Sequence, residues 1–423
     1  MKVHFITFGC KANQYDTERF RQELEARGAV VVDDPALADT CVVNTCTVTN
    51  QADAVARKAI RRVKREQPRM RVVVAGCSAA LHPERYGAMA EVFGVVRGHE
   101  PDELSSLIAP DAPLLERDEE PIGAALLERN AWGTRGFMKI QDGCDRRCSF
   151  CATRLARGKS RSRAPRDLVS EAARLAGHHR EIVITGIHIG HYGLDLNERG
   201  RKSGHSLATL MRRLLDEVPD TRFRVGSVEA TEIDDLMLEL LETSGGRLVP
   251  HLHVPMQAGS ERVLRAMQRW HTRDQYRRRI LEIGERLPYL GLGADVIVGF
   301  PGERDEDFDE TRRLVEELPF TYLHVFPYSV RDHTIAATLP DQIPSVTAAE
   351  RSRILRDLAM EKGMAYRRGR VGQGAEIIVE EGDFGLTEDY LRVRLKGDLD
   401  AHRGRIVYAP LKMEEEELVA RIG

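Results

Sequence analysis

An alternation of short apolar runs with helical patterns constrains the fold of this chain most. Between residues 2 and 103, apolar runs at 3–7, 40–43 and 71–75 are followed by helical patterns at 17–27, 53–66 and 83–93. This rhythm of strand and helix builds a parallel sheet covered by helices. The sequence therefore predicts an α/β domain at the N-terminal end.

A second, longer alternation begins at Phe137. We expect its strands at residues 137–141, 181–185, 222–228, 247–254, 292–298 and 322–326, with helical stretches between most of them. Six such units fall short of the eight that close a full barrel. The prediction is a partial (β/α)6 barrel whose active mouth lies at the C-terminal ends of its strands.

The remaining segments set the domain boundaries. Residues 109–130 are rich in Pro, Gly and acidic residues, as a linker is. After a helical stretch at 347–368, short β-rich runs at 375–380, 390–395 and 404–408 predict a small antiparallel β-barrel. We expect an N-terminal domain at 1–108, a linker at 109–130, a barrel domain at 131–362 and a C-terminal β-domain at 363–423.

Composition excludes several classes of protein. The chain has 423 residues, of which 42% are hydrophobic and 30% charged, so a disordered or collagen-like chain is excluded. No secretory signal pattern and no run of about 18 apolar residues are found, so we expect a cytoplasmic protein without a membrane partner. Its seven cysteines favour thiolate chemistry or metal ligation over disulfides.

Three cysteines stand close together just beyond the first expected strand of the partial barrel. Cys144, Cys148 and Cys151 follow a C-x3-C-x2-C spacing. Three thiolates can ligate three irons of a 4Fe-4S cube and leave the fourth iron open to a substrate or cofactor. The alternative, a closed zinc site, takes four ligands, and no fourth Cys or His lies nearby in the sequence. The spacing therefore favours an iron–sulfur cluster.

Three further cysteines share a topological position. Cys10, Cys46 and Cys77 each come just after an expected parallel strand, whose C-terminal ends meet at one edge of the sheet. Three buried apolar cysteines would be the alternative. The shared position favours a second cluster site, whereas Cys41 falls at the opposite edge and is expected to be a core thiol.

The C-x3-C-x2-C motif resembles the signature of the radical S-adenosylmethionine (SAM) superfamily. This resemblance implies that SAM binds the open iron and is cleaved to a 5'-deoxyadenosyl radical. With the dispersed cysteines and the C-terminal β-domain, nearly the whole chain resembles the methylthiotransferases. That family implies a flavodoxin-like N-terminal domain, two 4Fe-4S clusters and an RNA-binding TRAM-like barrel. One cluster then generates the radical and the other supplies sulfur, so an external electron donor and a sulfur source are needed.

Further segments resemble motifs of that family at the expected barrel mouth, among them HLHVPMQAGS at 251–260 and DVIVGFPGE at 295–303. The residues that the resemblance assigns to cofactor binding are Phe150, Gly186, Ser227, Glu229, Gln257, Val298 and Tyr328. His251 and His253 stand two apart on one expected strand, where hydrogen bonding is favoured over metal ligation.

The substrate of such an enzyme is a tRNA adenosine or a ribosomal-protein aspartate, and local charge favours RNA. Basic clusters hold phosphates, although a solvated helix face is the alternative. The expected RNA contacts are Arg157, Lys159, Arg161, Arg163 and Arg392.

The segment GCKANQY at residues 9–15 resembles the branch of the family that acts on N6-threonylcarbamoyladenosine next to the tRNA anticodon. The resemblance implies insertion of a methylthio group at carbon 2 of that base. Isopentenyladenosine in tRNA and a ribosomal-protein aspartate stay open as substrates. A non-catalytic iron–sulfur protein that binds RNA or senses redox state is an alternative of another class. The oligomeric state stays undecided.

Overall fold

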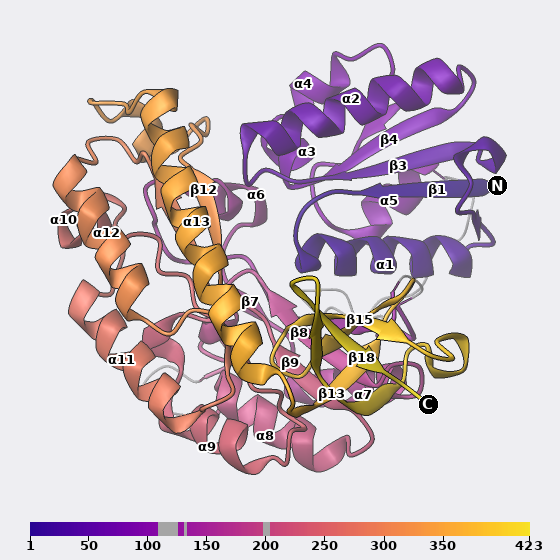
Figure 1. The fold of residues 1–423 in the computed structure, drawn as a ribbon. Helices are drawn as coiled ribbons and strands as arrows, with labels where there is room; N and C mark the ends of the chain where they lie inside the picture. The colour runs from indigo at the N-terminus through magenta and orange to yellow at the C-terminus, as the bar shows by residue number, and fades with distance from the viewer. Residues whose placement is uncertain (109–125, 131–132, 198–203) are drawn as a thin grey trace.

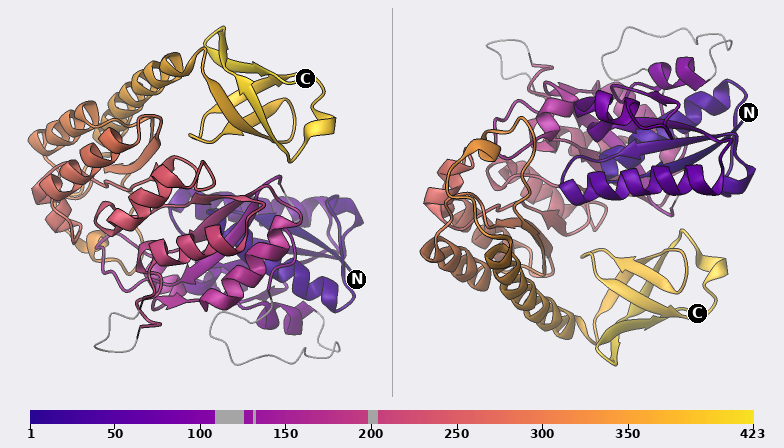
Figure 2. Two further views of the ribbon diagram at one scale, coloured as in Figure 1. Left: turned by 90° about the horizontal axis from the view of Figure 1, so that it is seen from below. Right: turned by 90° about the horizontal axis from the view of Figure 1, so that it is seen from above.

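The computed structural model describes residues 1–108, 126–130, 133–197 and 204–423. Most of the expected linker at 109–130 therefore lies outside the described residues. Figure 1 shows the N-terminal domain and the C-terminal β-domain on the same side of a central curved sheet. The two further views in Figure 2 agree with this placement. None of the described helices is both long and apolar enough to span a membrane.

The N-terminal domain is a five-stranded parallel sheet in the order β2-β1-β3-β4-β5. This strand order is that of flavodoxin-like folds, as expected. Its strands are β1 (Lys2–Thr7), β2 (Val30–Val31), β3 (Thr40–Thr45), β4 (Arg71–Gly76) and β5 (Gly94–Val95). Its helices are α1 (Lys11–Ala26), α2 (Asn50–Glu66), α3 (Cys77–Leu81), α4 (Pro83–Gly87), α5 (Pro101–Ile108) and the 3-10 turn η1 (Pro35–Leu37).

Two helices of this domain differ from the expectation. Helix α1 begins at Lys11, whereas the sequence predicted a start at residue 17. The prediction missed the first turns because they bury polar side chains such as Asn13 and Asp16 and so lack an apolar stripe. The helix expected at 83–93 ends at Gly87, and the chain continues in turns. Cys41 is fully buried in the apolar core, as predicted.

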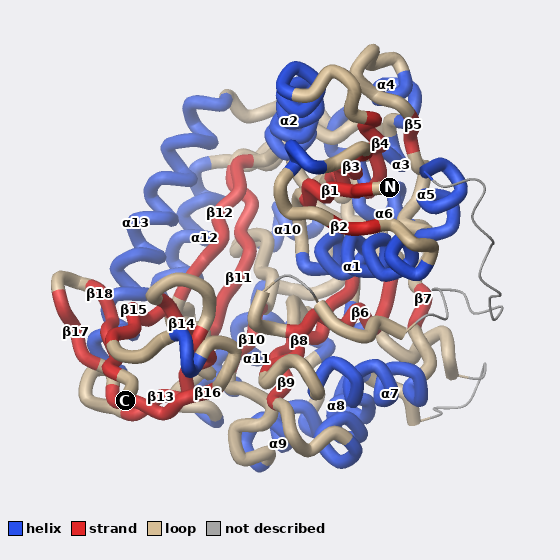
Figure 3. Tube along the Cα trace, turned by 90° about the vertical axis from the view of Figure 1, so that its right-hand side faces the viewer, coloured by secondary structure: helices blue, strands red, loops and turns tan. Residues whose placement is uncertain are grey.

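The central domain is the predicted partial barrel. Its parallel strands are β6 (Gly136–Asp142), β8 (Glu181–Gly186), β9 (Arg222–Val225), β10 (His251–His253), β11 (Gly291–Val298) and β12 (Tyr322–Pro327). Isolated bridges join β9 to β10, and β7 (Arg161–Ser162) pairs antiparallel with β6. Figure 3 shows these strands following one another around an arc. Strand β10 is shorter than expected because Pro250 and Pro255, which cannot donate to a ladder, flank it.

Helices cover the outer face of this arc. They are α7 (Pro165–Ala176), α8 (Leu207–Glu217), α9 (Asp235–Thr243), α10 (Glu261–Ala266), α11 (Arg273–Arg286), α12 (Asp305–Glu317) and α13 (Ser345–Arg370). The short helix α6 (Thr153–Arg157) instead packs against α3 of the N-terminal domain. The 3-10 turns are η2 (Ile189–His191), η3 (Ala230–Glu232) and η4 (Ile335–Thr338). Helix α13 packs along β12 and leads into the C-terminal domain.

The C-terminal domain is a curled six-stranded sheet in the order β16-β13-β14-β15-β18-β17. Its elements are β13 (Gly374–Val379), β14 (Phe384–Thr387), β15 (Arg392–Lys396), η5 (Asp400–His402), β16 (Ile406–Pro410), β17 (Lys412–Glu414) and β18 (Glu417–Arg421). All neighbours are antiparallel except β15 and β18. The domain docks on the barrel where the guanidinium of Arg224 donates to the carbonyls of Thr387 and Glu388, at 3.0 and 2.9 Å.

Candidate active site

The first trio of cysteines gathers at one edge of the N-terminal sheet. Cys46 directly follows β3, Cys77 directly follows β4, and Cys10 precedes α1 at the end of neighbouring β1. Burial raises the pKa of the Cys77 thiol to about 12, Arg157 opposes this rise, and the nearby thiols of Cys10 and Cys46 add to it. Cys10 and Cys77 are 67 positions apart in the sequence, and the fold brings both of them together with Cys46.

Glycines let the backbone pass close to these thiols. A Cβ at Gly9, whose φ is +99°, would lie 2.7 Å from the Cβ of Cys46. A Cβ at Gly76, whose φ is +93°, would lie 2.3 Å from Oδ1 of Asn44. A side chain is excluded at both places, so the edge is shaped around its cysteines.

Replacing Gly76 with alanine is therefore expected to destabilise the domain by about 2 kcal/mol or more, through the positive φ and the overlap with Asn44. Urea unfolding measures the change. Gly87→Ala is the matched control, because a Cβ there meets nothing within 4 Å, and its expected change is under about 0.5 kcal/mol. Equal stability of the two variants would contradict the close fit around Gly76.

The second trio lies on the loop between β6 and α6, at the mouth of the barrel. Cys144, Cys148 and Cys151 are half-buried and line a cavity of about 550 Å³, together with Cys10 of the first trio. Burial raises the pKa of the Cys144 thiol to about 11. The first trio therefore reaches this cavity through Cys10, whereas Cys46 and Cys77 are buried behind it.

Nitrogen donors surround the sulfur atoms of both trios. The Arg269 guanidinium donates to Sγ of Cys148 at 3.4 Å, and Nε of Arg157 donates to Sγ of Cys77 at 3.3 Å. Nδ1 of His188 lies 3.5 Å from Sγ of Cys144. Three thiols with such donors are the environment that iron–sulfur clusters require, because hydrogen bonds to sulfur set their potentials. The residues of each trio fit a 4Fe-4S cluster.

Five of the seven expected cofactor residues lie at this cavity. The five are Phe150, Gly186, Ser227, Glu229 and Gln257. The side chain of Val298 is fully buried and does not line the cavity. Tyr328 lines a neighbouring cavity of about 190 Å³, which shares Phe150 and Gln257 with the first.

Two clusters of histidines and a carboxylate lie at the cavity wall, and the sequence singled out only His253 and the motif that begins at Asp295. The carboxylate of Glu232 lies 2.9 Å from Nε2 of His188, and burial, which alone would raise its pKa, is outweighed by hydrogen bonds from His188 and His191 that lower the pKa to about 2. On the opposite side, Oδ1 of Asp295 lies 2.9 Å from Nε2 of His253 and 3.2 Å from Nδ1 of His324. The first cluster reaches the cysteines through His188, whose Nδ1 lies 3.5 Å from Sγ of Cys144.

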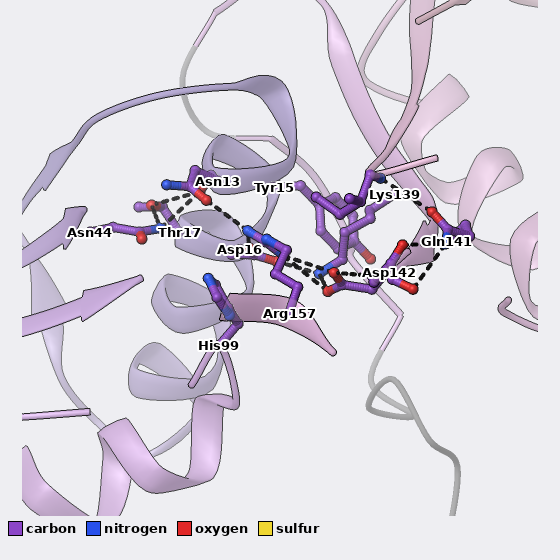
Figure 4. A network of polar contacts seen from close by, with 12 residues as sticks. Asn13, Tyr15, Asp16, Thr17, Asn44, His99, Lys139, Gln141, Asp142 and Arg157 are labelled. Carbon is purple, nitrogen blue, oxygen red and sulfur yellow. Dashed lines mark hydrogen bonds and ion pairs between the residues drawn. The ribbon is translucent and has the colours of Figure 1, made fainter. Parts of the chain in front are cut away.

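A buried polar network joins the N-terminal domain to the barrel (Figure 4). The guanidinium of Arg157, from α6, donates to Asp142 at 3.0 Å and to Asp16 of α1 at 2.7 Å. Lys139 also pairs with Asp142, at 2.8 Å, and with Asp16. Because these side chains are almost fully buried, the network fixes how one cysteine trio lies relative to the other.

The structure corrects two of the expected RNA contacts. Arg157 lies in this network, and Arg163 donates to Glu171 at 2.7 Å and to the hydroxyl of Tyr15 at 2.9 Å. Both arginines are 5% exposed, so they hold the domains together and do not face RNA. Both arginines also bind residues of α1 that are far away in the sequence, Asp16 for Arg157 and Tyr15 for Arg163, so local charge density alone misplaced them.

The other three expected RNA contacts are more accessible. Lys159 is exposed on the loop after α6, and Arg161 is half-buried at the start of β7. Arg392 is exposed on β15, with its guanidinium 3.5 Å above the ring of Phe384. The three stay predicted phosphate contacts.

Several cavity residues carried no sequence signal. Trp270 lies between the guanidiniums of Arg146 and Arg269, each 4.0 Å from its ring centroid. Tyr390 reaches the cavity from the C-terminal domain. No spacing rule could place Tyr390 at the cavity. Lys11 also lines the cavity, and its position directly after Cys10 marks it in the sequence as a cation beside a predicted cluster ligand.

Comparison with known proteins agrees with this geometry. The model described as "Uncharacterized protein family UPF0004" matches residues 2–98, and that of the radical SAM superfamily matches residues 138–315. The chain is 35% identical over 409 residues to the threonylcarbamoyladenosine tRNA methylthiotransferase MtaB of Aquifex aeolicus, which covers 94% of this chain and 97% of that protein. MtaB of Bacillus subtilis is 36% identical over 422 residues, covering 94% of this chain and 91% of that protein.

A solved structure shares the fold at low sequence identity. It is the radical SAM methyltransferase TsrM from Kitasatospora setae, with cobalamin and a 4Fe-4S cluster bound, and it matches with a TM-score of 0.56. The match covers 79% of this chain and 77% of that chain, at 16% identity. On the strength of its relatives and its two domain matches, the chain belongs to the MtaB family of tRNA methylthiotransferases, within the radical SAM superfamily.

Proposed function

We propose that this enzyme inserts a methylthio group at carbon 2 of N6-threonylcarbamoyladenosine, next to the anticodon of tRNA. Its relatives from Aquifex aeolicus and Bacillus subtilis are named for this nucleoside, and its chain matches theirs over more than nine-tenths of its length. The chain is a radical SAM enzyme whose cofactors are SAM and 4Fe-4S clusters. In this proposal Cys144, Cys148 and Cys151 hold the cluster that binds SAM, and Cys10, Cys46 and Cys77 hold the other.

The observation that carries the proposal is the shared cavity, which Cys10 of one trio lines together with all three cysteines of the other. Carbon 2 of a purine carries an unreactive C–H bond. Acid–base side chains cannot break this bond, so a cofactor must break it. When bound, the two clusters supply the electron that cleaves SAM and the sulfur that enters the base. One nucleobase in this cavity has access to both.

The protein's own residues then bind and orient. Arg269 donates to Cys148 and to Oε2 of Glu229, at 3.4 and 2.5 Å, and so ties the cluster loop to the wall where SAM is expected. Lys159, Arg161 and Arg392 are the proposed phosphate contacts, which steer the tRNA to the cavity. An external electron donor and a sulfur source complete the reaction.

Mass spectrometry of tRNA nucleosides tests the substrate. Cells that lack this protein are expected to lose methylthiolated threonylcarbamoyladenosine, to accumulate the unmethylthiolated nucleoside, and to recover when the gene is restored. Loss of methylthiolated isopentenyladenosine instead would show that the assigned base is wrong. Unchanged tRNA with a changed ribosomal protein would show that the substrate is not RNA.

A further inference from the structure

One corner of the shared cavity combines a cation with a wall of aromatic rings. The wall consists of His251, Tyr322 and Tyr390, which all line the cavity. The His251 and Tyr390 rings stack with centroids 4.2 Å apart, and Nε2 of His251 lies 2.8 Å from the Tyr322 hydroxyl. Lys11 lies beside this wall, with Nζ 5.9 Å from the centroid of Tyr390. We call these four residues the Lys11 corner.

The Lys11 ammonium has no carboxylate of its own. Among the described residues, no hydrogen bond or ion pair of its Nζ with a carboxylate is found, and its Nζ makes a cation–π contact with Tyr390. The acidic groups that act on it are the carboxylate of Glu181 and the thiol of the adjacent Cys10. Both oxygens of Glu181 are taken, at 2.7 Å, by the Nε atoms of Arg222 and Arg224.

The surroundings of Lys11 also carry excess positive charge. The guanidinium of Arg224 lies 5.4 Å from the centroid of the same Tyr390 ring that Lys11 approaches to 5.9 Å. An ammonium held among cations at a partly enclosed site is costly unless an anion joins it. The Lys11 corner is therefore built to receive a negative group.

The position of the corner narrows the choice of anion. Lys11 lines the cavity together with three aromatic rings, and flat rings beside a cation suit an extruded base better than a backbone phosphate. The SAM residues Gly186, Ser227 and Glu229 line the cavity next to the barrel trio, whereas Lys11 directly follows Cys10 of the other trio. The anion therefore belongs to the nucleobase that receives the sulfur.

We propose that Lys11 binds the free carboxylate of the threonyl group on the substrate adenosine, while Tyr390 positions Lys11 and closes this side of the cavity. The inference rests on the proposed function and names the contact that would make the site selective. An isopentenyl group at the same nitrogen is a hydrocarbon and has no anion to pair with Lys11. Binding of that base would leave the ammonium without a partner and would therefore be weaker. The C-terminal domain thus contributes to the base pocket as well as to RNA binding.

Binding of anticodon stem-loops tests this contact. The protein, reconstituted anaerobically with iron and sulfide, is titrated with a fluorescent stem-loop that carries threonylcarbamoyladenosine and with one that carries plain adenosine. The wild-type protein is expected to prefer the modified stem-loop by about tenfold to a hundredfold, the effect of one charge-assisted hydrogen bond. Lys11→Met is expected to abolish that preference and to leave the affinity for the plain stem-loop within about twofold.

Three controls accompany the titration. Lys2→Met removes an exposed lysine at the start of β1, in the same domain, and is expected to keep the preference. Lys11→Gln, which keeps a polar head without the charge, is expected to lose most of it and serves if Lys11→Met fails to fold. Tyr390→Leu is expected to weaken the preference while iron content stays unchanged, which a purely structural role would not produce.

Two results would overturn the inference. Equal weakening of both stem-loops by Lys11→Met would show that Lys11 meets the RNA backbone. A weaker affinity for SAM in equilibrium dialysis, with the stem-loop preference intact, would show that Lys11 meets the cofactor. The proposed function fails separately, when the wild-type protein itself shows no preference for threonylcarbamoyladenosine and methylthiolates another nucleoside.

Discussion

Cys46→Ala is expected to leave reductive cleavage of SAM intact and to abolish methylthiolation of tRNA. Cys46 directly follows β3 in the N-terminal domain, and the barrel trio keeps its own three thiols and its contacts with Arg269 and His188. Under the proposed roles, removing one thiol of the first trio takes away the sulfur-donating site and spares the radical-generating one. The readouts are 5'-deoxyadenosine and methylthiolated nucleoside, measured in the same anaerobic assay.

Cys148→Ala is the complementary change and is expected to abolish both products, because no radical forms without the barrel cluster. After reconstitution each variant should hold about four irons per chain, against about eight in the wild-type protein. Cys41→Ala is the matched control, since Cys41 lies in the same domain but in the apolar core; both products should persist. Loss of cleavage with Cys46→Ala and its survival with Cys148→Ala would exchange the two roles.

The cysteine positions were predictable because they follow a rule that does not depend on side-chain detail. The C-terminal ends of neighbouring parallel strands meet at one edge, so Cys10, Cys46 and Cys77 had to gather once β1, β3 and β4 formed one sheet. The C-x3-C-x2-C loop is local and needs no fold at all. This part of the site could therefore be predicted from strand patterns and spacing.

The rest of the site depends on how the domains pack against one another, and those contacts cannot be predicted from the pattern of a single sequence. Arg157 and Lys159 look alike as basic residues after the cluster loop, yet the first is buried against Asp16, 141 residues away, and the second is exposed. Tyr390 reaches the cavity only because the C-terminal domain docks on Arg224. The first turns of α1 were missed for the same reason: their polar side chains are buried against the barrel domain, and a polar face does not predict a buried one.

Arg157→Leu is expected to destabilise the folded protein by about 3–5 kcal/mol, the effect of leaving buried charge without its partner. In the wild-type protein two carboxylates, Asp16 and Asp142, face two cations, Arg157 and Lys139. The substitution leaves two negative charges against one positive charge in the interface that Figure 4 shows. Urea unfolding measures the loss, and Arg166→Leu, which removes an exposed arginine that pairs with its neighbour Asp167, should change stability by under about 0.5 kcal/mol.

Acid pH distinguishes this electrostatic cause from a loss of packing. Burial alone would raise the pKa of Asp16, but Lys139 and Arg157 outweigh it and hold the pKa below its ordinary value. The stability that Asp16 contributes is therefore present above about pH 4, the pKa of an unfolded aspartate, and is lost as the pH falls through the lower folded value. Without Arg157 the folded pKa rises, so protonation in mild acid relieves the unpaired charge. The stability difference between wild type and Arg157→Leu should shrink as the pH falls below about 5; a difference that stays constant with pH would show that packing, and not charge, is what Arg157 supplies.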